Sequence, residues 1–391
     1  MSDVLMKTYA RLPVAFTHGA GARLWDDQGR EYLDALSGIA VCNLGHAHPR
    51  VRDTLCAQAE RLVHTSNLYR IPAQEALGAE LCRVSGLERV FFCNSGAEAN
   101  EAAIKLARLH GHQRGLSRPT IAVMSGAFHG RTLAALAATG NEKAQRGFEP
   151  TVEGFVRLPF GDLAAAEALA HTDTPVAAIL VEPIQGEGGI RVPPAEYLPG
   201  LRALCDRQGW LLMVDEVQAG MARTGRWFGH QHSGIRPDVM TLAKALGNGV
   251  PIGACVAGGV AAELFAPGHH GSTFGGNPLA SAVGCAVLET IDECALGQRA
   301  ATLGTRMLGG FREGLGRRPE VREVRGQGLM LGIELDRPCG ALVGQALEAG
   351  LLINVTAEST IRLLPPLVID DAQADRIVAE VTRLVEQFLD G

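Results

Sequence analysis

The segment "DVMTLAKALGNGVPIG" at residues 238–253 places a short apolar run directly before a lysine and two glycines. The run "DVMTLA" is too short and too apolar for a strand with one face in water, so it predicts a strand buried on both faces. Lys244 follows where that strand would end. It is one of only four lysines among the 36 basic residues of the 391-residue chain. An amine at this position therefore calls for a chemical reason.

Four more apolar runs precede this one, and helical patterns separate them. They are "RVFFC" (89–93), "TIAVM" (120–124), "VAAILVE" (176–182) and "WLLMVD" (210–215). Short apolar runs that alternate with helices predict a mostly parallel sheet covered by helices on both faces. The sequence thus predicts an α/β fold for the middle of the chain.

The two ends of the chain have a different pattern. "ARLWDDQGREYLDAL" (22–36) predicts a hairpin with a turn at Asp-Gln-Gly, and "VREVRGQGLMLGIEL" (321–335) predicts another. The tail "DAQADRIVAEVTRLVEQFL" (371–389) has apolar residues at helical spacing. We expect a large α/β domain over residues 51–284 and a smaller α+β domain formed by residues 1–50 and 285–391.

Composition limits the class of protein and its partners. Hydrophobic residues make up 47% and charged residues 20%, as in a soluble globular protein. A net charge of −6 argues against nucleic acid or an anionic membrane as a partner. Nine cysteines without a C-x-x-C pair predict reduced thiols, and "MSDVLMKTYARLP" lacks the apolar core of a signal peptide. We expect a cytoplasmic protein.

In open α/β sheets, ligands bind at the carboxyl ends of the strands, so the residues that follow each run are candidates for a site. After the first run, Ser95 is a good helix N-cap, and Glu98 three residues later completes a capping box. Gly96 would let a phosphate approach the free N–H groups of the helix start. The alternative is that Ser95 and Gly96 merely begin a helix.

Phe128 and Arg131 follow the second run in "AFHGRT". Phe128 could cover a planar ring or simply belong to the core. Arg131 suits bidentate recognition of a carboxylate, or it is an ordinary surface cation.

Asp215 ends the fourth run, where a buried carboxylate without a partner would be costly. It could pair with a buried cation such as a protonated ring nitrogen, or it could cap the next turn.

Lys244 ends the fifth run, and an amine there has a chemical use. A primary amine can form a Schiff base with a carbonyl compound, whereas a guanidinium cannot. The alternatives are a solvated surface charge and a codon bias that explains the arginine excess.

Several familiar motifs are absent. "GNGVPIG" (247–253) and "GQGLMLG" (326–332) each have one residue too many for the dinucleotide fingerprint, and there is no P-loop. The histidine pairs lack a metal-binding frame, so we expect loop or surface histidines and no metal site. These pairs are His46/His48, His110/His112, His230/His232 and His269/His270.

The chain as a whole resembles the class III aminotransferases, which have the fold type I of enzymes that use pyridoxal phosphate. The similar blocks are "SGAEANEAAIKLAR", "FHGRT", "EPIQGEGG", "DEVQAGMARTG", "TLAKALGNGVPIG" and "GSTFGGNPLASA", in the order found in that family. The similarity runs from "LWDDQGREYLDALSGIAV" to "IRLLPPLVI". It implies the seven-stranded type of sheet in the large domain. "GIAVCNLGHAHP" and "HTSNLY" are most similar to members that act on N2-acetylornithine.

The resemblance implies a role for each residue near the cofactor. Lys244 would bond to pyridoxal 5'-phosphate and carry the proton, and Asp215 would keep the ring nitrogen protonated. Phe128 would stack on the ring, and Gln218 would bond near its phenolic oxygen. Thr273 would reach in from the partner subunit, which implies a homodimer with shared active sites. The cofactor set is Ser95, Gly96, Ala97, Phe128, Asp215, Val217, Gln218, Lys244 and Thr273.

The resemblance also implies the substrates. Arg131 and Ser272 would contact acylated ornithine, Arg362 would bind the α-carboxylate of glutamate, and Glu187 would pair with Arg362 when the ω-amine is bound. The implied reaction moves the δ-amino group of N2-acetylornithine to 2-oxoglutarate, as in arginine biosynthesis. Rival donors are succinylornithine, ornithine, 4-aminobutyrate and N-succinyl-diaminopimelate. An isomerase with the same cofactor and a non-catalytic ligand-binding homologue are further alternatives.

Overall fold

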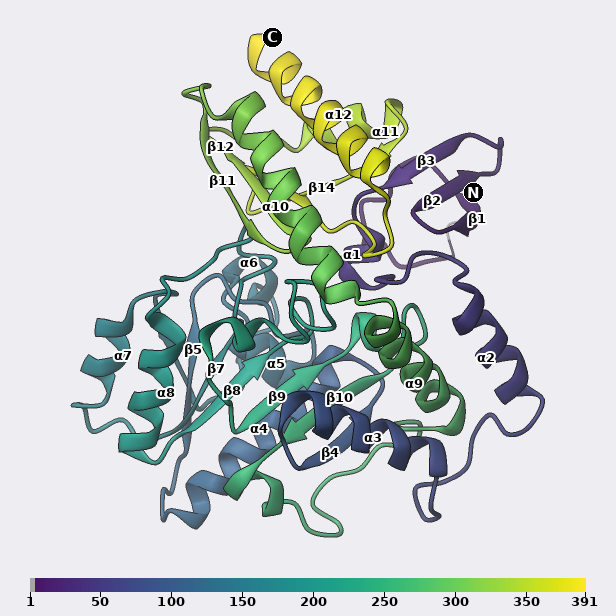
Figure 1. Ribbon diagram of the computed structural model, residues 1–391. Coiled ribbons are helices and arrows are strands. Elements are labelled where there is room, and N and C mark those ends of the chain that lie inside the picture. Colours follow the sequence, from purple (N-terminus) through teal and green to yellow (C-terminus); the bar gives the residue numbers. More distant parts are fainter. Residues whose placement is uncertain (1–3) are drawn as a thin grey trace.

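The computed structural model describes residues 4–391, and its centre is a seven-stranded sheet. The strand order is β4-β10-β9-β8-β7-β5-β6 (Figure 1). All neighbours from β9 to β6 pair in parallel, whereas β10 is antiparallel to both β4 and β9. The predicted α/β fold with a mostly parallel sheet is confirmed.

The five predicted strands are present, with ends that differ from the predicted ones by at most one residue. They are β4 (Arg89–Cys93), β5 (Thr120–Met124), β7 (Val176–Val181), β8 (Leu211–Asp215) and β9 (Val239–Leu242). Two strands of this sheet were not predicted: β6 (Phe155–Leu158) and β10 (Gly253–Ala257). β10 is made largely of small residues and follows a glycine- and proline-rich stretch, so its pattern does not suggest a strand.

Helices cover both faces of this sheet. Ile121 and Val123 of β5 pack on the side of α4 (Gly96–Gln113), whereas Ala122 and Met124 pack on the side of α7 and α8. This alternation explains why the strands are apolar throughout. The other helices in this part of the chain are α2 (Pro49–Ala59), α3 (Pro72–Ser85), α5 (Leu133–Ala138), α6 (Glu142–Gln145), α7 (Leu163–Leu169), α8 (Tyr197–Gln208) and α9 (Pro278–Glu293), with 3-10 turns η1 (Gly229–Ser233), η2 (Lys244–Leu246) and η3 (Gly259–Glu263).

The two ends of the chain come together on one side of the large sheet (Figure 1). One small sheet joins β1 (Phe16–Ala20), β2 (Arg23–Asp26) and β3 (Glu31–Asp34) to β13 (Leu351–Leu352). The other contains β11 (Val321–Gln327), β12 (Met330–Leu335), β15 (Thr360–Leu363) and β14 (Asn354–Thr356). Helices α10 (Leu296–Leu315), α11 (Ala341–Glu348) and α12 (Asp371–Asp390) lie beside these sheets.

Both predicted hairpins and the predicted tail helix are observed. The division into domains at residues 50 and 284 stays a prediction. Helix α9 crosses the second boundary without a break, and the largest apolar cluster takes side chains from both proposed parts.

Arg223 is a buried cation that connects the chain ends to the loop after β8. Its guanidinium donates to the carbonyl oxygens of Leu329 and Pro365, and to the side chains of Ser37 and Asn43. Burial lowers the pKa of Arg223 to about 9. Because these are neutral acceptors from both ends of the chain, Arg223 ties those ends to the large sheet.

The short element α1 (Ser37–Ala40) is a left-handed turn. Its four φ angles are 46° at Ser37, 65° at Gly38, 67° at Ile39 and 58° at Ala40. Left-handed backbone is unfavourable for residues other than glycine, by about 1–2 kcal/mol each. The surrounding contacts must therefore hold this turn in place. No helix in residues 4–391 is long and apolar enough to cross a membrane.

Candidate active site

A cavity of about 360 Å³ lies where the carboxyl ends of the parallel strands meet. Nine of the predicted site residues line it: Ser95, Gly96, Ala97, Phe128, Arg131, Asp215, Val217, Gln218 and Lys244. The strand ends bring these residues together from β4, β5, β8 and β9, as the parallel sheet requires.

The start of α4 forms one wall of the cavity. Ser95 is the N-cap, and its Oγ accepts a hydrogen bond from the N–H of Glu98 at 3.2 Å. The Glu98 carboxylate accepts from the N–H of Asn94, so the predicted capping box is shifted by one residue. Within residues 4–391, no acceptor is seen for the N–H groups of Gly96 and Ala97. Two free N–H groups at the start of an 18-residue helix suit a phosphate.

Gly96 also has a packing role. A Cβ atom there would lie 2.9 Å from Cγ1 of Val217, closer than real contacts allow. Glycine therefore lets the helix start approach Val217, which lines the same cavity.

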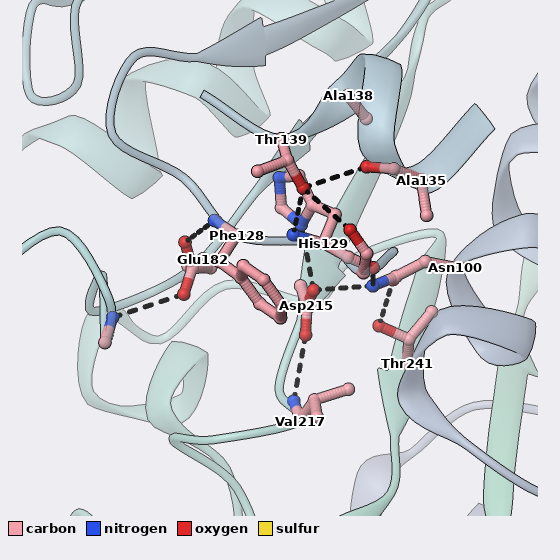
Figure 2. A network of polar contacts seen from close by, with 12 residues as sticks. Asn100, Phe128, His129, Ala135, Ala138, Thr139, Glu182, Asp215, Val217 and Thr241 are labelled. Carbon is pink, nitrogen blue, oxygen red and sulfur yellow. Dashed lines mark hydrogen bonds and ion pairs between the residues drawn. The ribbon is translucent and has the colours of Figure 1, made fainter. Parts of the chain in front are cut away.

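Asp215 lies at the other side of the cavity and is only 4% exposed. Its Oδ2 accepts from Asn100 Nδ2 and from His129 Nδ1, both at 2.8 Å, and its Oδ1 accepts from the N–H of Val217 at 3.0 Å (Figure 2). No lysine or arginine in the described residues forms an ion pair with it. A buried carboxylate without a permanent cation fits a ligand that carries positive charge nearby.

Glu182, at the end of β7, is a second buried acid that lines the cavity. Its carboxylate accepts from the N–H of Phe128 at 3.1 Å and from that of Gly186 at 3.2 Å (Figure 2). Burial raises the pKa of Glu182, and the charge of Asp215 adds to the rise while His129 opposes it. The sequence places an acid at the end of this strand, but it does not indicate which groups the carboxylate would bind.

Lys244 lines the cavity in a strained backbone conformation. Its φ is 49°, in the left-handed region, where the chain leaves β9 and begins η2. Burial lowers the pKa of Lys244, although the charge of Glu187 opposes the change. No hydrogen bond or salt bridge from its Nζ is seen within residues 4–391. A lowered pKa and a free amine favour a nucleophile or a proton carrier over a structural cation.

Arg362, on β15, is 1% exposed and forms a salt bridge with Glu187. It also donates to Asn354 Oδ1 at 2.7 Å and to Gln218 Oε1 at 3.3 Å. Burial alone would raise the pKa of Glu187, but Arg362 lowers it below its ordinary value. Gln218 lines the main cavity, so this pair lies next to it.

Arg131 lies at the mouth of the cavity. Its guanidinium carbon is 5.7 Å from the centre of the Phe128 ring, and its side chain is exposed. Arg131, Phe128 and Glu187 also line an adjoining cavity of about 880 Å³. Ligands larger than the main cavity therefore have room beyond Arg131.

Ser272 and Thr273 do not line the cavity of their own chain. Ser272 Oγ accepts from Asn94 Nδ2 at 3.2 Å, whereas Thr273 is exposed. The structure places this loop beside the start of α4 without bringing Thr273 to the predicted phosphate position.

The expectation of loop or surface histidines is wrong for two of them. His230 is buried with its Nδ1 at 2.8 Å from the Glu216 carboxylate, and His110 is buried on α4. His46 is half-buried and lies 2.7 Å from the Asp34 carboxylate. In the described part of the chain, no group of three or more metal-binding side chains is found.

The fold and the cavity with Lys244 and Asp215 agree with the resemblance to the class III aminotransferases. The family model described as "Aminotransferase class-III" matches residues 5–385, and the chain belongs to this family. It is 56% identical over 391 residues to the acetylornithine aminotransferase of Nitrosomonas europaea. That match covers 100% of this chain and 99% of the relative.

Solved structures of aminotransferases have the same fold. An ornithine aminotransferase of Toxoplasma gondii with partial occupancy of PLP at its active site is 36% identical, with a TM-score of 0.94. The match covers 98% of this chain and 91% of that one. An N-acetylornithine aminotransferase of Stenotrophomonas maltophilia is 37% identical, with a TM-score of 0.85 and 98% of each chain covered.

Proposed function

We propose that this aminotransferase uses pyridoxal 5'-phosphate to move the δ-amino group of N2-acetylornithine to 2-oxoglutarate. The observation that carries the proposal is that the Lys244 amine and the Asp215 carboxylate line one cavity. The amine has a lowered pKa, and the carboxylate is buried without a permanent cation. This combination fits a cofactor with an aldehyde and a basic ring nitrogen.

The residues of the cavity suit each part of that cofactor. The N–H groups of Gly96 and Ala97 would hold its phosphate, with Ser95 beside them, and Asp215 would pair with its ring nitrogen. Phe128 would cover one face of the ring, and Gln218, next to Val217, would bond to its phenolic oxygen. When bound, the protonated ring supplies a sink for negative charge at the reacting carbon.

The protein's own groups then have separate tasks. Lys244 Nζ would take a proton from the carbon that bears the amino group and deliver it to the aldehyde carbon of the cofactor, on the other side of the amino nitrogen. Asp215 would keep the ring nitrogen protonated, because an ionised acid beside it stabilises positive charge. Phe128 would exclude water from the ring face.

The Arg362–Glu187 pair would allow one site to serve two substrates. When the donor presents an uncharged chain toward Arg362, Glu187 neutralises the buried guanidinium. When 2-oxoglutarate or glutamate binds, its carboxylate would take the place of Glu187. Arg131 would hold the acylated end of the donor, and the adjoining cavity has room for it. Ser272 lines neither cavity of its own chain, so we propose that it reaches the donor in the site of the partner, as Thr273 does.

We also propose a homodimer in which Thr273 completes the phosphate site of the partner. Leu68, Tyr69 and Phe274 are large, exposed apolar side chains near this loop. Asn67 Nδ2 donates to the carbonyl oxygen of Ser272 at 3.0 Å, so the two apolar segments are neighbours. Large exposed apolar side chains on neighbouring segments favour an interface. All nine cysteines are free thiols, which supports the cytoplasmic location that we propose.

Ornithine is the second candidate donor, because the Toxoplasma gondii structure with a TM-score of 0.94 is an ornithine aminotransferase. The two donors differ at the α-amino group, which is an uncharged amide in acetylornithine and a cation in ornithine.

A half-reaction screen tests the proposal. Purified protein is mixed with one donor at a time, and the change in the cofactor's visible absorbance is followed in a stopped-flow instrument. The donors are acetylornithine, succinylornithine, ornithine, 4-aminobutyrate and N-succinyl-diaminopimelate. We expect acetylornithine to react fastest per unit concentration. A faster reaction with ornithine would replace the proposed donor, and no reaction with any donor would overturn the transaminase assignment.

A further inference from the structure

We propose that Asn100 is the positioning residue that sets the Asp215 carboxylate relative to the phosphate-binding start of α4. This inference rests on the proposed use of pyridoxal phosphate. Asn100 is not at the predicted cofactor positions, and its side chain is buried at 1% exposure. It lies one helical turn after Ala97, on the helix whose first N–H groups face the cavity.

Every hydrogen-bonding group of the Asn100 amide is used. Nδ2 donates to Asp215 Oδ2 at 2.8 Å and to the carbonyl oxygen of His129 at 2.7 Å. Oδ1 accepts from Thr241 Oγ1 at 2.8 Å. Figure 2 shows the amide between Asp215 and Thr241. A fully bonded buried amide has one orientation, because any rotation would leave buried groups without partners.

These bonds join the structural elements that carry the cofactor-binding groups. Asn100 belongs to α4, which begins at the phosphate position, and Asp215 ends β8. Thr241 lies on β9, three residues before Lys244. The carbonyl oxygen of His129 directly follows Phe128 in the chain. A single amide therefore fixes the phosphate end, the ring acid, the lysine strand and the ring-stacking loop relative to one another.

The chemistry of the site requires an amide at this position. Two acceptors, a carboxylate and a carbonyl oxygen, face the same Nδ2, so the group there must be a donor of two hydrogens. An aspartate in place of Asn100 would direct lone pairs and a like charge at Asp215, and the two carboxylates would repel each other. That repulsion would move the Asp215 carboxylate away from the position in which it holds a protonated ring nitrogen.

The position of Asn100 on the helix predicts where a substitution acts. The N–H groups of Gly96 and Ala97 belong to the backbone of α4 and do not depend on the Asn100 side chain. The carboxylate of Asp215 does depend on it. Substitutions at Asn100 should therefore weaken binding of the cofactor's ring and leave binding of its phosphate unchanged.

The affinities for two probes distinguish an effect on binding of the ring from an effect on binding of the phosphate. Pyridoxal 5'-phosphate and pyridoxal, which lacks the phosphate, are each titrated into the full-length protein from which bound cofactor has been dialysed. We expect Asn100→Asp to weaken the binding of both probes by the same factor, about tenfold or more. Ser95→Ala serves as the matched control at the other end of the cavity. It should weaken pyridoxal 5'-phosphate and leave pyridoxal unchanged.

Thr241→Val keeps the test informative if Asn100→Asp does not fold. It is nearly isosteric, removes the hydroxyl that orients the amide, and adds no charge. It should weaken both probes, and Thr241→Ser should restore their binding. The melting temperature of each cofactor-free variant is measured alongside.

Several results would overturn the inference. One is wild-type affinity for both probes in Asn100→Asp and Thr241→Val. Another is a loss confined to the phosphorylated probe. A third is a loss of affinity that only follows the fall in melting temperature, because that would indicate a purely structural role. A wild-type protein that binds neither probe would instead overturn the proposed function on which the inference rests.

Discussion

Removal of the Glu187 carboxylate should strengthen binding of 2-oxoglutarate and weaken binding of the amine donor. Arg362 is 1% exposed, and Glu187 is its one charged partner among residues 4–391. Asn354 and Gln218 supply neutral acceptors, and the Nε of Arg362 has no partner. A substrate carboxylate that binds Arg362 must therefore displace Glu187, whereas in Glu187→Ala it would meet a buried cation with no competitor.

The size of the effect follows from the burial of the two partners. Breaking a fully buried ion pair costs about 3–5 kcal/mol. The Glu187 side chain is 36% exposed, so water screens part of its charge. We therefore expect about 1–2 kcal/mol, which corresponds to roughly tenfold tighter binding of 2-oxoglutarate. Glu187→Ala should also lower the stability of the ligand-free protein by a similar amount. Glu187→Gln, which keeps an acceptor without the charge, should give an effect of the same sign and smaller size.

Single-substrate stopped-flow experiments can measure both halves of this prediction. The apparent dissociation constant of 2-oxoglutarate is read from the concentration dependence of its half-reaction, and that of the amine donor from the other half-reaction. Binding of 2-oxoglutarate should strengthen while binding of the donor weakens. Unchanged affinity for 2-oxoglutarate in both variants, or equal changes for the two substrates, would refute the competition between Glu187 and the substrate carboxylate.

Four further predictions address the cofactor site and the stability of the fold. Lys244→Ala should lose the visible absorbance of the bound cofactor and all turnover while its circular dichroism is unchanged; colour and activity that persist would exclude Lys244 as the bonding residue. Asp215→Ala should lower the rate by about a hundredfold or more with the fold retained, and near-native turnover would contradict the role of Asp215 at the ring nitrogen. Burial alone would lower the pKa of His46, but the Asp34 carboxylate, with a smaller contribution from Cys42, raises it from 6.5 to about 9. The His46–Asp34 pair contributes its full stabilisation below about pH 6.5 and loses it as the pH rises through 9. In urea unfolding, the free energy of unfolding of His46→Asn should therefore decline less over that range than that of the wild type. Ala295 is exposed with a φ of 50°, so Ala295→Gly should raise the free energy of unfolding by about 0.5–1 kcal/mol, and a fall would show that strain there is negligible.

Residues that end a buried strand were predictable from the sequence. The runs before Asp215 and Lys244 are apolar on both faces, and a parallel sheet brings the carboxyl ends of its strands to one edge. The roles of these residues came from the family resemblance. Strand β10 was missed because small residues and glycines carry no strand pattern, although it occupies the place between β4 and β9.

The supporting residues of the site could not be predicted. Asn100 lies inside a helix, and an asparagine in that position has no signature in the sequence. His129 is the neighbour of Phe128, but nothing in the sequence shows that its Nδ1 lies 2.8 Å from Asp215. These two contacts join residues that are 86 or more positions apart. They exist because α4 packs across the sheet and because β5 and β8 end at the same edge of it.

By itself, the sequence determined the α/β class, the strand ends that carry Asp215 and Lys244, and the helix start at Ser95, because each depends on local apolar pattern or capping chemistry. The tertiary structure alone decided how these groups face one another. It brought Arg362 and Glu187 together across 175 residues as the family resemblance implies, gave Lys244 its left-handed backbone, and surrounded Asp215 with the donors of Asn100, His129 and Val217. Those features depend on packing between distant segments, and no local pattern in the chain encodes them.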